Sequence, residues 1–300
     1  MALIHRDAPY PHWEFEDPAT GDRLRLVPER GGLISGWRSQ GRELLYLDEA
    51  RFADPALSVR GGMPVLFPIC GGLPGNRLPL PQGDFTLAQH GFARDLPWQL
   101  EPLPDGRGVA MELADDPTTR AAYPFSFRLK LEARLMEAGL ELSASVEHLG
   151  TDPHRAGATD AAAGTPLMPF SFGLHPYFAV SSLESVAVEG LPDACFDHLT
   201  MAPATTATQL PRLADGIDLL SRPAGPVRLR DRGNGRVIEL QCSHPWDLVV
   251  LWSEPPRPMV CLEPWTGPRQ SLLSGDRRLE LAPGATLHLR SRFVVLDPGR

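Results

Sequence analysis

Apolar and polar residues alternate along much of this chain, and the alternation is clearest over residues 127–146. The odd-numbered positions 127–135 are apolar while the even-numbered positions between them are charged, which is the period of a half-buried strand. The pattern breaks at Glu137-Ala138-Gly139 and resumes with apolar residues at positions 140, 142, 144 and 146. We therefore expect a β-hairpin with its turn at this break.

The same signals recur elsewhere in the chain. Asn234-Gly235 separates the alternating runs 227–230 and 237–240, which predicts a second hairpin closed by a type I′ turn. Further strands are expected at residues 24–27, 33–37, 43–47, 247–252, 258–262 and 286–296. Only residues 50–56 read as a helix, and the 32 prolines and 28 glycines disfavour others. The pattern predicts an all-β fold that spans residues 1–300 as a single domain.

Two segments interrupt the strand pattern. Residues 60–85 are dense in glycine and proline, so we expect a long irregular loop, which in a compact domain is more often functional than accidental. Residues 151–165 are small, polar and almost free of bulky apolar side chains. This stretch is expected to be a mobile surface insertion remote from the chemistry.

Composition and motifs exclude several classes of function. The formal charge of −8 does not indicate the basic surface that a nucleic-acid-binding protein needs, and no apolar run approaches the 18 residues of a membrane span. The first residues lack the apolar core of a signal peptide, so a cytoplasmic location is expected. The four cysteines are scattered, without zinc-site spacing, and no phosphate-loop or dinucleotide motif occurs. We expect reduced thiols, no cofactor and no metal.

His175 is the first candidate for chemistry. It lies in Pro169-Phe170-Ser171-Phe172-Gly173-Leu174-His175-Pro176-Tyr177-Phe178, enclosed by four aromatic residues. A histidine so enclosed needs a hydrogen-bond partner, and histidine is the side chain best suited to proton transfer near neutral pH. The alternative is a core histidine bonded to a main-chain carbonyl.

A carboxylate at the end of an apolar strand is the second candidate. Glu263 ends the run Pro258-Met259-Val260-Cys261-Leu262-Glu263. A carboxylate buried there without a partner has a raised pKa, as a general base or acid requires, although a strand-end glutamate can also point into solvent. Trp265 beside it offers a flat surface for a sugar ring.

Two further stretches carry polar residues in unusual surroundings. Gln89-His90-Gly91-Phe92-Ala93-Arg94 places a histidine next to a glycine that leaves room for a ligand, though a buried turn with a surface arginine fits equally. Asp197 follows Phe196 in a short segment where an acidic residue is usually solvated.

Taken together, these stretches resemble the aldose 1-epimerases, or galactose mutarotases, and most closely their hexose-6-phosphate mutarotase branch. The matching segments are Arg60-Gly61-Gly62-Met63-Pro64-Val65-Leu66-Phe67-Pro68, Gln89-His90-Gly91-Phe92-Ala93-Arg94, Leu174-His175-Pro176-Tyr177-Phe178, Asp197-His198-Leu199-Thr200 and Glu263-Pro264-Trp265. They occur in the family's order over about two hundred residues.

The resemblance implies a large antiparallel β-supersandwich of galactose mutarotase type and an enzyme that interconverts sugar anomers. It implies His175 as general acid and Glu263 as general base, with a sugar or sugar phosphate as the partner. The sugar-binding groups it implies are Arg60, His90, Arg94 and Asp197. No cofactor, nucleic acid or membrane is expected, and the chain is expected to be a monomer or weak homodimer.

Several alternatives and details stay open at this point. A non-catalytic carbohydrate-binding or sensor protein could use the same scaffold, and Asp197 with Glu263 could supply the two carboxylates of a glycoside hydrolase. By analogy with such carboxylates, we expect His175 and Glu263 to be roughly 5–9 Å apart across the pocket. If the substrate is phosphorylated, two of Arg60, Arg77 and Arg94 should converge at one end.

Overall fold

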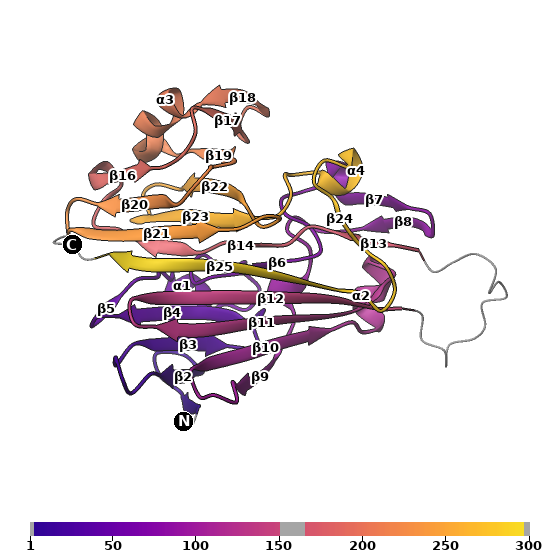
Figure 1. Cartoon of the computed structure of the whole chain (residues 1–300), viewed down its shortest axis with the longest axis horizontal. Coiled ribbons are helices and arrows are strands. Elements are labelled where there is room, and N and C mark those ends of the chain that lie inside the picture. Colours follow the sequence, from indigo (N-terminus) through magenta and orange to yellow (C-terminus); the bar gives the residue numbers. More distant parts are fainter. Residues whose placement is uncertain (1–2, 151–165, 297–300) are drawn as a thin grey trace.

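The structure is a computed structural model that describes residues 3–150 and 166–296. The expected mobile insertion at 151–165 lies outside the described residues. Two eight-stranded antiparallel sheets dominate the fold (Figure 1), which confirms the all-β class. Within the described ranges no helix has the length and apolar character that a membrane crossing requires.

The first large sheet contains the longest strands. Its order is β16-β20-β21-β25-β12-β11-β10-β9. The bounds are β16 Val186–Glu189, β20 Val227–Asp231, β21 Arg236–Cys242, β25 Thr286–Leu296, β12 Gly139–Gly150, β11 Ser126–Met136, β10 Gly108–Ala114 and β9 Gln99–Pro102.

The second large sheet carries the candidate residues. Its order is β18-β17-β19-β22-β23-β14-β6, and β15 also pairs with β23. The bounds are β18 Ala202–Thr205, β17 Ala194–Asp197, β19 Asp218–Ser221, β22 Leu248–Ser253, β23 Met259–Trp265, β14 Gly173–Leu174, β15 Tyr177–Ala179 and β6 Val65–Leu66.

Smaller elements complete the chain. An N-terminal meander pairs its five strands in sequence order, and two separate two-stranded sheets are the hairpin β7-β8 and the pair β13-β24, whose strands are far apart in the chain. These strands are β1 Ile4–Arg6, β2 His12–Glu16, β3 Arg23–Val27, β4 Leu33–Ser39, β5 Arg42–Glu43, β7 Arg77–Leu80, β8 Gly83–Thr86, β13 Met168–Phe170 and β24 Leu279–Leu281. The α-helices are short: α1 Glu49–Phe52, α2 Pro117–Ala122, α3 Thr206–Gln209 and α4 Ser271–Ser274.

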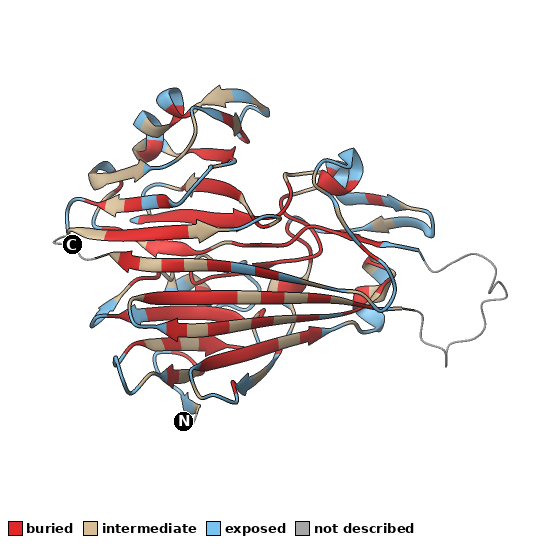
Figure 2. Ribbon diagram, viewed as in Figure 1, coloured by how far each residue is buried: buried red, intermediate tan, exposed pale blue. Residues whose placement is uncertain are grey.

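The hairpin expected from the alternating run is confirmed. Met136 pairs with Gly139, so β11 and β12 are joined by a two-residue turn, and the apolar side chains of both strands face the core. Across the sandwich, the rings of Phe178 and Phe293 meet at 5.2 Å, which joins the two sheets in one core. Figure 2 shows buried residues along the central strands of both sheets.

Two local expectations were wrong. The second hairpin closes with a four-residue loop between paired Asp231 and Arg236, and only Gly235 in it has a positive φ, so no type I′ turn forms. The reason is Asp231, whose buried carboxylate accepts hydrogen bonds from the Gly233 amide and the Asn234 side chain and so holds a wider loop. The glycine-rich stretch is also less irregular than expected, because β6, β7 and β8 lie within it.

Strand β23 has two different faces, and this places the candidate residues. Val260 and Leu262 belong to the main core, whereas Cys261 and Trp265 belong to smaller clusters on the opposite side. Because side chains alternate along a strand, Glu263 shares the face of Cys261 and Trp265. The candidate carboxylate therefore lies on the outer face of the second sheet.

Candidate active site

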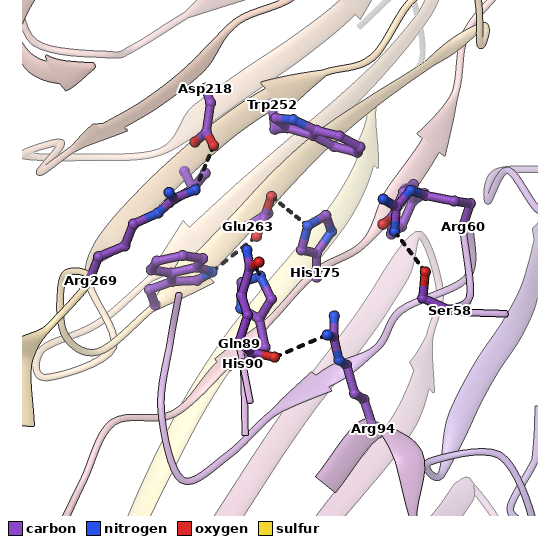
Figure 3. Close-up of a pocket in the computed structure, with 13 residues that line it drawn as sticks. Ser58, Arg60, Gln89, His90, Arg94, His175, Asp218, Trp252, Glu263 and Arg269 are labelled. Atoms are coloured by element: carbon purple, nitrogen blue, oxygen red, sulfur yellow. Dashed lines mark hydrogen bonds and ion pairs between the residues drawn. The ribbon is translucent and has the colours of Figure 1, made fainter. Parts of the chain in front are cut away.

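A cavity of about 230 Å³ opens on this outer face of the second sheet. Strands β19, β22 and β23 form one wall of this cavity, and loops that lie mostly in the N-terminal half form the rest of its lining (Figure 3). The lining residues are Ser58, Arg60, Gln89, His90, Arg94, His175, Tyr177, Asp218, Val250, Trp252, Glu263, Trp265 and Arg269.

The strand register brings His175 and Glu263 together. Gly173 pairs with Trp265 and Tyr177 pairs with Cys261 on the same strand, β23. The position midway between them, His175, therefore lies opposite Glu263. His175 Nε2 and Glu263 Oε1 are 3.3 Å apart, so the expected gap of 5–9 Å was wrong: the two side chains are neighbours on one wall.

Glu263 is almost completely buried, with 1% exposure. One carboxylate oxygen, Oε2, accepts a hydrogen bond of 3.0 Å from Trp265 Nε1. Burial, and then the negative charge of Asp218, raise the pKa of Glu263 well above its ordinary value, while the bond from Trp265 works in the opposite direction. The carboxylate is thus oriented by the indole and remains a strong proton acceptor.

His175 is perturbed in the opposite direction. Burial, followed by the charge of Arg94, lowers its pKa from 6.5 to about 3. The ring is held by stacking on Tyr177, with centroids 4.7 Å apart. Both pKa shifts disfavour the ion pair and favour the neutral pair, in which the proton lies on the carboxyl of Glu263 and the imidazole of His175 is uncharged.

The loop that carries His90 is built on an unusual backbone. His90 and Gly91 both have positive φ, and a Cβ on Gly91 would collide with the carbonyl oxygen of Phe67. The Gly71 amide donates to His90 Nδ1 at 3.0 Å, so the ring proton lies on Nε2. Because burial also lowers the pKa of His90 well below its ordinary value, the ring is a neutral donor in the cavity wall.

Arg60 and Arg94 both line the cavity near Ser58: Arg60 donates to the Ser58 hydroxyl, and Ser58 and Arg94 also line one small adjoining cavity. Arg60 contacts Glu254 at 3.3 Å, and its guanidinium lies 6.0 Å from the ring centre of Trp252. Arg94 donates to the carbonyl of Gln89 at 3.0 Å. Each guanidinium keeps further donors for a ligand.

Asp197 is not among the described residues that line this cavity. Its carboxylate accepts hydrogen bonds from the Leu199 amide, the Thr200 hydroxyl and the Gln209 side chain. These bonds already occupy the carboxylate in the turn after β17, so the structure brings together Glu263 and the other candidates without Asp197.

Asp218 supplies the cavity carboxylate that sequence reasoning missed. It accepts from Arg269 at 2.6 Å and contacts His198 Nδ1 at 2.7 Å. Its position in the apolar run Ile217-Asp218-Leu219-Leu220 was a usable signal, since a charge inside such a run needs partners. Arg269 had no comparable signal.

The aromatic surface also differs from expectation. Trp265 is 1% exposed, and its ring stacks on His198 and meets the edge of His90. Its surface is therefore covered by protein. Trp252 also lines the cavity and is less buried, which makes it the better platform for a sugar face.

Comparison with known proteins identifies similar chains. The family model described as aldose 1-epimerase matches residues 22–292. A protein from Cenchrus ciliaris named "Putative glucose-6-phosphate 1-epimerase" is 32% identical over 171 residues, which cover 54% of this chain and 45% of the relative. The match thus spans less than half of that relative's length.

Solved structures share the whole fold. The Slr1438 protein from Synechocystis is 32% identical, with a TM-score of 0.87 and 99% of each chain covered. A galactose mutarotase related enzyme from Lactobacillus acidophilus has a TM-score of 0.72 at 21% identity and covers 96% of this chain and 98% of its own. The fold is the β-supersandwich of the galactose mutarotase type.

Proposed function

This chain belongs to the aldose 1-epimerase family, and from that membership we propose that it interconverts the α and β anomers of a hexose. The observation that carries the proposal is the contact of 3.3 Å between His175 Nε2 and Glu263 Oε1 at the cavity wall. The anomeric hydroxyl and the ring oxygen are bonded to the same carbon, so two adjacent groups can reach both. Carboxylates that flank a glycosidic bond need the wider spacing.

The reaction needs only the proton that this pair shares. The pair reacts as an ion pair, which forms when the shared proton passes from Glu263 to His175 across their 3.3 Å contact. Glu263 then takes the proton of the anomeric hydroxyl while His175 gives its proton to the ring oxygen. The ring opens to the aldehyde, and the pair is left as protonated carboxyl and neutral imidazole. Rotation about C1–C2 presents the other face of the aldehyde, and the two transfers then run in reverse.

The neutral pair favoured by burial is the protonation state that accompanies the open-chain sugar. It differs from the starting ion pair of Glu263 and His175 only by proton transfers through the substrate. The hydroxyls of the sugar have further partners in the His90 Nε2 proton and the carboxylate of Asp218, and the ring face of Trp252 can pack on the apolar face of the sugar. These groups surround the pair in Figure 3 and support binding of a hexose.

The function is tested by following a pure anomer to equilibrium by NMR or polarimetry. Glu263→Gln and His175→Asn should each slow the enzyme by about 10²–10⁴-fold. The double variant should be little worse than either single one, because groups that act as a unit are not additive. Wild-type turnover in either single variant would reject the assignment.

A hexose 6-phosphate is the proposed substrate. Arg60 and Arg94 both line the cavity near Ser58, and the name of the Cenchrus ciliaris relative refers to glucose 6-phosphate. Arginine forks suit a phosphate dianion. Arg77, the third arginine considered, is exposed, pairs with Asp84 on the β7-β8 hairpin and is not a lining residue.

The three arginines give a matched test of this substrate. Arg60→Ala and Arg94→Ala should lower kcat/KM for glucose 6-phosphate by about 10–150-fold, the equivalent of one charge-assisted hydrogen bond of about 1.5–3 kcal/mol. The effect on glucose should be smaller. Arg77→Ala should behave as wild type with both sugars. Equal kcat/KM for the two sugars in the wild-type enzyme would refute phosphate recognition while leaving the anomer chemistry intact.

A further inference from the structure

Cys261 is a buried thiol that the proposed mechanism does not use. It lies on β23 two residues before Glu263, on the same face, and it pairs in register with Tyr177. Its Sγ, a His175 ring nitrogen and a Glu263 carboxylate oxygen all lie within 4.8 Å of one another. Three donors of three different kinds therefore lie close together, and two of them, on His175 and Glu263, belong to residues that line the cavity.

The spacing of these donors fits a tetrahedral metal ion. Nitrogen and oxygen ligands about 2.0–2.2 Å from Zn²⁺ are about 3.4 Å apart at the tetrahedral angle, and His175 Nε2 and Glu263 Oε1 are 3.3 Å apart. A sulfur ligand at about 2.3 Å would lie about 3.6 Å from either. The three donor atoms are at most 4.8 Å apart at present. For Cys261 to bind the same ion as the other two residues, the longest of these separations must therefore shorten by no more than about 1.2 Å.

The surrounding residues hold two of the donors in position. Trp265 Nε1 bonds Glu263 Oε2 and leaves Oε1 free, and stacking on Tyr177 fixes the ring of His175. Such supporting contacts orient the ligands of metal sites. The cavity itself leaves a fourth position for water, as in zinc sites with three protein ligands.

We propose that His175, Cys261 and Glu263 form a binding site for a thiophilic divalent cation, with Zn²⁺ the preferred ion. A thiolate with an imidazole selects zinc or cobalt over magnesium and calcium, which prefer oxygen ligands. On binding, the Cys261 thiol and the protonated carboxyl each release a proton to solvent, and no redox change is involved. Because the ion occupies both proton-transfer groups, it acts as an inhibitor.

Cobalt reports the site without reference to catalysis. Titrating metal-free protein with Co²⁺ should produce a thiolate-to-metal charge-transfer band and the visible bands of tetrahedral Co²⁺, and Zn²⁺ should displace them. Cys261→Ala should remove the charge-transfer band and weaken binding by at least about 10-fold. Cys195→Ala is the matched control: Cys195 is also a free buried cysteine, but it lies on β17 and does not belong to the cluster of His175, Cys261 and Glu263.

Circular dichroism and thermal unfolding check that each variant is folded. If Cys261→Ala does not fold, Cys261→Ser replaces it, and the charge-transfer band of the wild-type protein tests thiolate ligation by itself. A wild-type protein without this band, or a band that survives Cys261→Ala, would overturn the proposal. Loss of the band in Cys195→Ala would do the same.

The inhibition arm rests on the proposed function. Zn²⁺ should inhibit anomer interconversion competitively with the sugar, EDTA should restore it, and the ratio of rates with and without Zn²⁺ should approach one in Cys261→Ala. Equal inhibition of Cys261→Ala and wild type would refute the role of Cys261. A cobalt band in a protein without anomer activity would refute the proposed function and leave the metal site standing.

Discussion

Trp265→Phe isolates the hydrogen bond that orients the proposed base. The indole Nε1 donates to Glu263 Oε2 at 3.0 Å in a site where Glu263 is 1% exposed. A phenyl ring keeps most of the packing against His198 and removes the donor. The perturbation therefore falls on the carboxylate and leaves the rest of the cavity in place.

The size of the effect follows from the kind of bond. A hydrogen bond to a charged group contributes about 1.5–3 kcal/mol, which corresponds to a loss of about 10–150-fold in kcat/KM when the ionised carboxylate acts. The bond also lowers the pKa of Glu263 against the effect of burial. Without the hydrogen bond from Trp265 the pKa of Glu263 rises further, so Glu263 and His175 keep their shared proton to a higher pH.

The assay is therefore the pH profile of anomer interconversion. Activity requires one proton on the pair, so it falls on the alkaline side where that proton is lost, and Trp265→Phe should move this limb to higher pH as the rate at neutral pH drops. Trp37→Phe is the control, since Trp37 is fully buried in β4 and its Nε1 has no hydrogen-bond partner among the residues described. A rate within about threefold of wild type with an unmoved alkaline limb would refute the reasoning.

Three other outcomes follow from the structure. Gly91→Ala should destabilise the fold by about 1–3 kcal/mol in urea unfolding, and by more than Gly75→Ala does. Both glycines have a positive φ, but a Cβ at Gly91 collides with the Phe67 carbonyl whereas a Cβ at Gly75 meets no atom within 4 Å. Equal losses of stability in the two variants would show that the collision is relieved. Glu263→Gln should raise the Tm, and the gain in Tm should grow as the pH rises above about 4.3. The reason is that folding raises the pKa of Glu263, so the wild-type protein loses stability once this carboxyl ionises in the unfolded chain. A difference in Tm between variant and wild type that stays constant from pH 5 to 8 would contradict this. Asp218→Ala should raise KM whereas Asp197→Ala should lower stability with little change in KM, and the reverse result would return the sugar-binding role to Asp197.

Sequence reasoning reached the strands because their pattern is local. The hairpin of β11 and β12 follows from alternation and a turn that can be read from the sequence, and the structure reproduces it. The loop after Asp231 could not be read in the same way. Its shape depends on which groups bond that carboxylate, including the Ser181 amide fifty positions earlier in the chain.

The site shows the same division between local and distant information. His175 and Glu263 were found because each stands in an apolar or aromatic run, but their contact depends on the pairing of β14 and β15 with β23, which no single stretch contains. Asp218 and Arg269 are partners of each other across fifty-one positions. Only the folded sheet makes them neighbours of Glu263.

The residues that line the cavity come partly from paired strands of the second sheet and partly from loops. Glu263 lies in a strand paired on both sides, so its amide should exchange with solvent only when the sheet opens as a whole. The arginines come from connections: Arg60 from an irregular loop, Arg94 from the short 3₁₀ turn Ala93–Asp95, and Arg269 from the segment after β23. Loops accept substitution more readily than central strands, so over evolutionary time the arginines around this cavity can change while the strand that carries Glu263 is kept.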